Sequence, residues 1–382
     1  FDRMENTVNH RLIEDSPDGR RLCYAFNEAV DTFVFEQTDT PVHLRAEYLF
    51  DDFGNTVQEN KLGVVGEDGD EQFMEKAFAY DFENWRLDRM ARSTTRDGSG
   101  AKVAEDLFTY DPRGNPLEHH RWLNLGDRFV LAIRNEYDDF GNVVRMTDAN
   151  GHSRSVVFDP VLNTFPVSEI IHLPSYDLSM SATYDLALGT VVSSVDFAGA
   201  QAAFQYDGLG RLIVGQRPAG ARTTYQYDLG SPISRTVTRV LEVQGGGTHD
   251  KFDYIDGLGR KIGSKVEAED DQWRFLDAVS FNRRKLENRR WLPYFTTTSE
   301  YETPDLQQPH LDLVHDAKGR TTEMVNPDGT RTRTVYEPLL EHHHDENDVA
   351  GANTPLTRRA DGLGRLIEVT ERNGPEEFHT RY

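Results

Sequence analysis

The pattern Asp-x-x-Gly, preceded in many copies by an aromatic residue, recurs along most of this 382-residue sequence and restricts its fold more than any other feature. It occurs eleven times, whereas composition alone would give roughly three copies. Aromatic copies begin at Phe50, Tyr110, Tyr137 and Tyr206, and the repeat aspartates between residues 51 and 228 lie 21 to 30 residues apart. This spacing indicates a chain built from one supersecondary unit repeated many times.

The residue types of the pattern are those of a tight turn. Aspartate at the first position can accept a backbone N–H, and glycine at the fourth can adopt a positive φ without a Cβ clash. We therefore predict that each copy connects two β-strands. The candidate turn residues are Asp51, Gly54, Asp111, Gly114, Asp138, Gly141, Asp207, Gly210, Asp256, Gly259, Asp316, Gly319, Asp361 and Gly364.

Two further residue types belong to the repeat. The repeat aromatics Tyr110, Tyr137, Tyr206 and Tyr227 are expected to stack between adjacent strands, and a ladder that binds sugars or peptides is the alternative. Arginines follow the glycine at positions 211, 260, 320 and 365. We expect them to pair with the repeat carboxylates.

Between the turns the sequence alternates with period two, as strands do. Thr223, Tyr225 and Tyr227 share one face, while Thr224 and Gln226 share the other. A single hairpin of this size cannot bury its own face, so neighbours must pair laterally. The predicted fold class is all-β, with the repeats joined in a long curved antiparallel sheet. The charged stretches 67–78 and 267–292 are expected to be solvated loops, with a helical turn or two as the alternative.

Composition and charge exclude several classes of function. Acidic residues outnumber basic ones 65 to 42, which gives a formal charge of -23. The resulting negative electrostatic field repels nucleic-acid phosphates, so we do not expect DNA or RNA binding. The longest apolar run, 129–133, is far shorter than the roughly 20 residues of a membrane span. Cys23 is the only cysteine, so no internal disulfide can form. We expect its side chain to be buried as a small hydrophobic residue. The start at Phe1 without Met leads us to expect a piece of a longer parent.

Residues 206–212 (YDGLGRL) and 361–366 (DGLGRL) closely resemble the repeats of YD-repeat (RHS) proteins, and the resemblance covers about residues 45–382. The less regular copies near 158–166 are similar to the central region of the B component of bacterial insecticidal ABC (Tc) toxin complexes. The resemblance implies a sheet that spirals into a hollow shell around a toxic C-terminal polypeptide. Teneurin ectodomains, which are similar, use the architecture for cell-surface adhesion. RHS shells of the toxin type commonly end in a self-cleaving site next to Asp-Pro-x-Gly-Leu; residues 111–114 (DPRG) continue differently, so this processing is not carried over.

No linker divides the sequence, and we therefore predict one repeat array over residues 1–382, with a less regular start at 1–45. Loops are expected at 63–71, 244–248 and 342–353.

Two clusters could bind metal, but neither has the spacing that metal sites require. Residues 342–346 (HHHDE) are consecutive, and 67–71 (EDGDE) lacks the spaced oxygen ligands of an EF-hand. We expect solvated loops at both, with weak Ca²⁺ binding at 67–71 as the alternative. No nucleophile elbow, P-loop or dinucleotide fingerprint is present. We therefore predict no metal, no cofactor and no catalysis.

The leading hypothesis is a non-catalytic structural segment of an RHS shell that encapsulates a toxin polypeptide, secreted or at the cell surface. Its partners would be the rest of the parent chain or a co-assembling toxin component, and the enclosed polypeptide. The alternative is a recognition module that binds glycan or a receptor protein through the repeat sheet. A carbohydrate-active enzyme is the third and least supported hypothesis.

Overall fold

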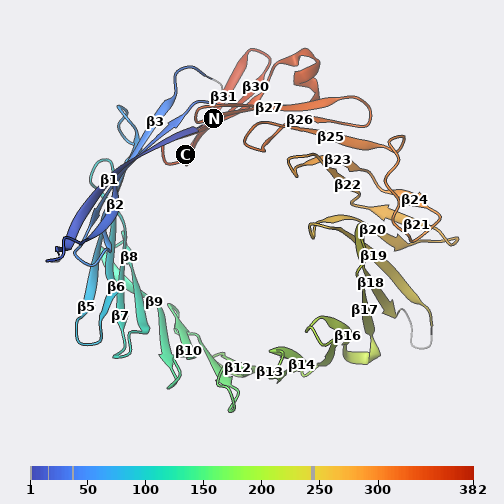
Figure 1. The fold of residues 1–382 in the computed structure, drawn as a ribbon, viewed down its shortest axis with the longest axis horizontal. Coiled ribbons are helices and arrows are strands. Elements are labelled where there is room, and N and C mark those ends of the chain that lie inside the picture. The colour runs from blue at the N-terminus through green and yellow to red at the C-terminus, as the bar shows by residue number, and fades with distance from the viewer. Residues whose placement is uncertain (1, 16, 37, 242–245) are drawn as a thin grey trace. The chain divides into compact units, whose positions relative to one another are not determined.

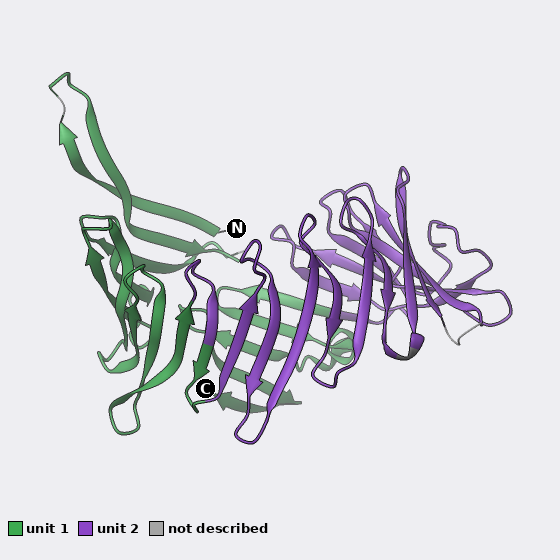
Figure 2. Ribbon diagram, turned by 90° about the horizontal axis from the view of Figure 1, so that it is seen from below, with its two compact units in different colours: residues 1–137, 146–151, 333–382 green, residues 138–145, 152–332 purple. Residues whose placement is uncertain are grey.

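The computed structural model describes residues 2–15, 17–36, 38–241 and 246–382, and the chain divides into two compact units (Figure 2). Unit 1 combines residues 1–137, 146–151 and 333–382, so it holds both ends of the sequence. Unit 2 comprises residues 138–145 and 152–332. The assignment of one uninterrupted repeat array stays a prediction.

The strands of unit 1 are β1 (Asp2–Asp15), β2 (Arg21–Val34), β3 (Val42–Phe50), β4 (Thr56–Val64), β5 (Gln72–Asp81), β6 (Arg86–Asp97), β7 (Lys102–Tyr110), β8 (Pro116–Leu123), β9 (Arg128–Tyr137), β28 (Leu340–His344), β29 (Leu356–Ala360), β30 (Leu366–Asn373) and β31 (Glu376–Arg381). The short η2 helix (Asp348–Ala352) follows β28. Two strands contribute residues to both units, β10 (Val143–Asp148) and β27 (Arg331–Glu337).

The strands of unit 2 are β11 (Ser153–Phe158), β12 (Pro166–His172), β13 (Asp177–Asp185), β14 (Thr190–Val195), β15 (Gln201–Tyr206), β16 (Leu212–Gln216), β17 (Arg222–Asp228), β18 (Ile233–Leu241), β19 (Thr248–Asp256), β20 (Lys261–Glu267), β21 (Trp273–Leu276), β22 (Val279–Phe281), β23 (Glu287–Trp291), β24 (Tyr294–Thr296), β25 (His310–His315) and β26 (Thr321–Val325). One 3₁₀ turn, η1 (Pro218–Gly220), precedes β17.

The predicted fold class is confirmed. All strands belong to antiparallel sheets of 22 and 9 strands, and η1 and η2 are the only helical segments in the described residues. Strands that follow one another in sequence pair side by side, as β2 to β9 do (Figure 1). Because most strands find a partner within one short connection, the repeat specifies most of the sheet locally.

The sheet is mostly a single layer. Only eight apolar residues of the described chain are buried, and most strand residues are half-buried. Seven of them form one cluster in unit 2, made of Val237, Phe252, Tyr254, Ile262, Phe275, Ala278 and Trp291. Lateral strand pairing rather than a thick core therefore holds most repeats together.

This cluster lies where the strand order branches. β20 pairs with β21, which pairs with β24, whereas β22 pairs with β23, which pairs with β25. The expectation of solvated loops at 267–292 was therefore wrong. Short strands there bury Phe275 and Trp291 among their neighbours, and these aromatic positions outweigh the surrounding charges.

The first hairpin corrects a second expectation. β3 pairs with β2 from Ala29 onward, so among the described residues the part of β2 before Ala29 has β1 alone as a strand partner. Cys23 lies in this part and is exposed. The prediction of a buried hydrophobe was therefore wrong, because no second strand of the described chain pairs with this part of β2.

The expected loops coincide only in part with irregular segments. Gly63 and Val64 still belong to β4, and β5 starts at Gln72, within the stretch 67–78 that was expected to be a loop. His342–His344 are in β28, paired with β27 and β29, so the loop expectation was wrong for these three residues. Part of the expected loop at 244–248 lies outside the described residues, and its last residue, Thr248, begins β19.

Candidate functional site

The repeat turn has one geometry, seen clearly at Asp207. Its carbonyl accepts the N–H of Gly210 at 2.9 Å, and its own N–H donates to the carbonyl of Arg211 at 2.9 Å. Its Oδ1 accepts the N–H groups of Leu209 and Arg211, both at 2.9 Å. Gly210 has a φ of +75°. A shorter side chain at 207 or a Cβ at 210 would disrupt this arrangement.

All seven predicted turns share the central bond from the glycine N–H to the aspartate carbonyl, with a positive φ at the glycine. The pairs are Asp51 and Gly54, Asp111 and Gly114, Asp138 and Gly141, Asp207 and Gly210, Asp256 and Gly259, Asp316 and Gly319, and Asp361 and Gly364. The flanking strands shift register by one residue at the turn, as at Gln205/Tyr206 before β16. A type I turn followed by a left-handed glycine bulge has this form.

The residue after the glycine completes the turn in two ways. In the first three copies it is asparagine, and Asn55, Asn115 and Asn142 each donate from Nδ2 to the turn aspartate at 2.8 to 2.9 Å. In the last four it is arginine, as expected, and Nε of residues 211, 260, 320 and 365 donates to the aspartate Oδ2 at 2.6 to 2.9 Å.

These hydrogen bonds lower the pKa values of Asp111, Asp207, Asp256 and Asp316. The backbone N–H of Arg211 is the largest cause that lowers the pKa of Asp207, and the guanidinium of Arg260 is the largest for Asp256. The pKa values of Asp111 and Asp316 are also lowered, because donors outweigh the burial that would raise them. These four carboxylates are therefore structural acceptors at neutral pH.

The repeat tyrosines link one repeat to the strand before it. The hydroxyls of Tyr110, Tyr137, Tyr206 and Tyr227 donate to the carbonyls of Met90, Pro116, Val191 and Leu212, at 2.7, 2.7, 2.8 and 2.9 Å. Three of these acceptors lie two residues after the glycine that closes the preceding hairpin, namely Gly114, Gly189 and Gly210. Sequence reasoning predicted ring stacking and missed these bonds. The use of tyrosine rather than phenylalanine at these positions was the available signal.

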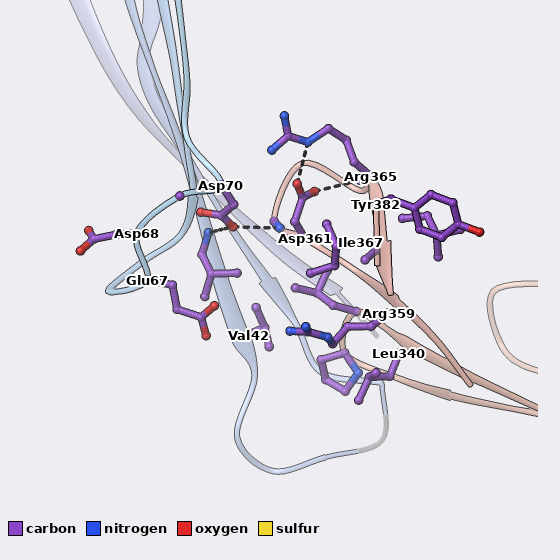
Figure 3. Close-up of a pocket in the computed structure, with 17 residues that line it drawn as sticks. Val42, Glu67, Asp68, Asp70, Leu340, Arg359, Asp361, Arg365, Ile367 and Tyr382 are labelled. Atoms are coloured by element: carbon purple, nitrogen blue, oxygen red, sulfur yellow. Dashed lines mark hydrogen bonds and ion pairs between the residues drawn. The ribbon is translucent and has the colours of Figure 1, made fainter. Parts of the chain in front are cut away.

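Unit 1 contains a site that the sequence did not indicate, formed by residues 63–70, which we call the corner segment. Asp70 is buried, and its Oδ2 accepts the N–H of Val64 at 3.0 Å and the N–H of Gly362 at 2.9 Å (Figure 3). The second bond joins residues 292 positions apart. The acidic stretch 67–71 therefore includes a buried structural carboxylate and is not wholly the solvated loop expected there.

A cavity of about 750 Å³ adjoins this contact. Its wall combines Val42 and Glu67 with Leu340, Arg359 and Tyr382 from the last part of the chain (Figure 3). Charges of both signs alternate with apolar groups, and this mixture selects no single ligand class.

The structure supports a metal site at neither of the two clusters considered from the sequence, residues 67–71 and 342–346. In the described residues no group of three or more His, Cys, Asp or Glu side chains is arranged to hold an ion. Within β28, His342 contacts Thr357 at 3.0 Å, and burial lowers the pKa of His344. No helix among the described residues is long and apolar enough to cross a bilayer.

The fold as a whole matches known structures. The crystal structure of TcdB2-TccC3-Cdc42 superposes with a TM-score of 0.83 over 99% of this chain and 29% of that chain, at 11% identity. TcdB2-TccC3 gives 0.81 over 99% and 27%, at 13% identity. The chain has the fold of the Tc toxin shell components.

A Tc holotoxin pore from Photorhabdus luminescens also matches, with a TM-score of 0.77 over 100% of this chain and 29% of that chain, at 11% identity. No family model and no curated protein sequence matches. The resemblance to Tc toxin RHS proteins is therefore confirmed at the level of the fold, and the chain spans less than a third of the chains it matches.

Proposed function

We propose that this chain is a non-catalytic wall segment of an RHS shell that encloses a toxin polypeptide for delivery. The observation that carries the proposal is the match of nearly the whole chain to the Tc toxin shell fold, with a TM-score of 0.83. The chain would act together with the rest of its parent or with a co-assembling toxin component, secreted or at the cell surface.

The construction of the sheet supports a wall. Most consecutive strands pair edge to edge, few side chains of the described residues are buried, and the hydroxyls of Tyr137, Tyr206 and Tyr227 each bond to a strand of the preceding hairpin. Such a sheet can extend repeat by repeat without a second layer. The right-handed twist of strands makes an extended sheet curve, which suits enclosure of a guest.

Limited proteolysis of the intact parent tests enclosure. The parent, expressed with its following segment, is treated with a broad-specificity protease, and the same segment freed by denaturation serves as the control. We expect the guest to be protected only inside the folded parent. Rapid digestion of the guest while residues 1–382 stay intact would reject enclosure.

One observation favours the recognition module as a second candidate. Phe53, Tyr80 and Phe82 form an exposed aromatic cluster in unit 1 with ring centroids 5.2 to 5.9 Å apart. Exposed aromatic clusters mark contact sites for sugars and proteins. Binding of the chain to glycan arrays that is lost in Phe82→Ala, with Phe378→Ala as an exposed control outside the cluster, would support this function.

A further inference from the structure

Three repeat turns have the same five residues, Asp-Gly-Leu-Gly-Arg, at 207–211, 256–260 and 361–365. All three have the same internal hydrogen bonds and the same positive φ at the second glycine. They differ in their surroundings, because one is covered and two are exposed.

The covered copy contacts the corner segment of unit 1. Its first glycine, Gly362, donates its N–H to Asp70 at 2.9 Å. A Cβ on Gly362 would lie 2.4 Å from Asp70 Oδ2, 2.5 Å from the nitrogen of Val64 and 2.7 Å from the carbonyl carbon of Gly63. Only glycine permits this approach of two backbones.

The leucine of the covered copy is also accommodated. Leu363 is half-buried and lines a groove of about 460 Å³ together with Val30, Leu44 and Tyr48 from β2 and β3. The covered turn thus places three groups: the amide of Gly362 donates to a carboxylate, Gly362 itself lies against backbone, and Leu363 lines a groove with both polar and apolar walls.

The other two copies present the same three groups to solvent. Leu209 and Leu258 are 77% and 61% exposed. No atom of the described chain lies within 4 Å of a Cβ placed on Gly208 or Gly257. For the N–H groups of these two glycines, no acceptor is found among the described residues.

Their own turns do not require glycine at this position. Neither Gly208 nor Gly257 has a positive φ. The corresponding position holds Asp52, Pro112 or Ala317 in other turns of this chain. Of these three glycines, only Gly362 is required by a contact within the described chain, because the corner segment approaches it too closely for a Cβ.

We propose that the turns 207–211 and 256–260 are docking surfaces for a polypeptide segment that has the chemistry of the corner segment, residues 63–70. The partner is a polypeptide that presents a carboxylate to the N–H of Gly208 or Gly257, backbone against that glycine, and to Leu209 or Leu258 a groove in which apolar side chains stand among polar ones, as in the groove beside Leu363. The covered copy at 361–365 shows the geometry of such a contact within this chain. The proposal therefore does not depend on encapsulation of a guest.

The intact chain can supply its own partner if its corner segment is freed. In Gly362→Val the added side chain overlaps Asp70 and Val64, so the 361–365 turn is displaced and the corner becomes available to a second molecule. We expect this variant to sediment as a dimer or larger species and the wild type as a monomer. Salt of about 0.5 M reduces the repulsion between the negative chains.

Matched variants separate docking from nonspecific aggregation. Adding Gly208→Ala and Gly257→Ala to Gly362→Val places a Cβ where the corner must approach, and adding Asp70→Ala removes the acceptor. Both combinations should return the protein to a monomer. Equal association in either combination, or a folded Gly362→Val variant that remains monomeric, would overturn the proposal.

A second experiment leaves the wild-type fold untouched. Unlabelled Gly362→Ala chain, in which one methyl group meets Asp70, Val64 and Gly63 and so releases the corner segment together with the groove of β2 and β3, is titrated onto wild-type chain with leucine methyl groups labelled for NMR. We expect saturable shifts at Leu209 and Leu258 that are absent in Gly208→Ala/Gly257→Ala. No shift at either leucine would contradict the proposal even if Gly362→Val fails to fold, and protease protection of a guest would be unaffected by this result.

Discussion

The hydroxyl of Tyr227 donates a 2.9 Å hydrogen bond to the carbonyl of Leu212, 15 residues earlier. Arg211, which is bonded to Asp207 at 2.7 Å, lies over the same tyrosine ring with its guanidinium carbon 4.6 Å from the centroid. One aromatic residue therefore contacts both the turn arginine and the strand that follows it. This relationship explains how a short repeat fixes the position of the next one.

Removal of the hydroxyl should weaken this link. We expect Tyr227→Phe and Tyr206→Phe each to lower the free energy of unfolding by about 0.5–1.5 kcal/mol, because a half-buried carbonyl loses its partner while the ring remains. Tyr225→Phe on β17 is the control, since no hydroxyl hydrogen bond of Tyr225 is seen in the described chain. Urea denaturation measures the differences. An equal effect of all three substitutions would argue against a role for the hydroxyl.

The two glycines of one turn should respond differently. Gly210 has a φ of +75°, whereas Gly208 lies outside the positive region, and a Cβ on either meets no close atom. Gly210→Ala should cost about 1–2 kcal/mol from the left-handed backbone alone. Gly208→Ala should be neutral or stabilising by up to about 1 kcal/mol. Thermal melting of the two variants tests this, and equal melting temperatures would contradict the assigned turn.

The turns were predictable from the sequence because their determinants lie within five residues. Asp207, Gly210 and Arg211 each contribute a group to the same turn, so composition and spacing reveal it. Lateral pairing follows, since each hairpin needs a neighbour.

The corner segment could not be predicted in this way. The bond between Asp70 and Gly362 crosses 292 positions, and Asp70 lies in an acidic stretch that resembles a solvated loop. Cys23 shows the opposite error, because its residue type favours burial while the local strand order leaves it uncovered. Contacts and exposure that depend on how distant strands are arranged cannot be recognised from the sequence around a single residue.

Acid should weaken the turns. The pKa values of Asp207 and Asp256 are lowered in the folded chain by bonds to Arg211 and Arg260. Their contribution to stability is complete above the unfolded value of about 3.9 and is lost as the pH falls through the folded values. We expect the melting temperature to drop below about pH 4.

The double variant Asp207→Asn/Asp256→Asn identifies the groups responsible. Asparagine keeps an acceptor in the turn but does not titrate. The variant should melt below the wild type at neutral pH, and the difference should narrow as the pH falls from about 5 to about 2.5. A difference that stays constant over this range would assign the acid sensitivity to other carboxylates.

Lys265 provides the strongest test of the cluster in unit 2. Its side chain is fully buried, and its Nζ donates to the carbonyls of Thr298 at 2.9 Å and Glu300 at 2.7 Å. The carboxylate of Glu302 lies 3.3 Å away. Lys265→Met keeps the volume but leaves two carbonyls without their donor, so we expect a loss of about 1–3 kcal/mol.

Lys265→Ala should cost more, because a cavity is added to the lost hydrogen bonds. Lys251→Met, which removes a partly exposed pair with Asp253, should change stability by less than about 1 kcal/mol. If Lys265→Met is no more destabilising than Lys251→Met, the buried ammonium does not hold the segment 298–302 in place.

The pH dependence of the same variant distinguishes a buried charge from simple packing. Burial lowers the pKa of Lys265, so at alkaline pH the unfolded chain binds more protons at this residue than the folded chain does. The contribution of Lys265 to stability therefore rises as the pH increases toward the ordinary value of about 10.4. We expect the deficit of Lys265→Met relative to the wild type to grow between about pH 7 and about pH 9.5. A deficit that shrinks over this range would mean that the folded chain stabilises the charged form, and the ion pair with Glu302 would then outweigh the cost of burial.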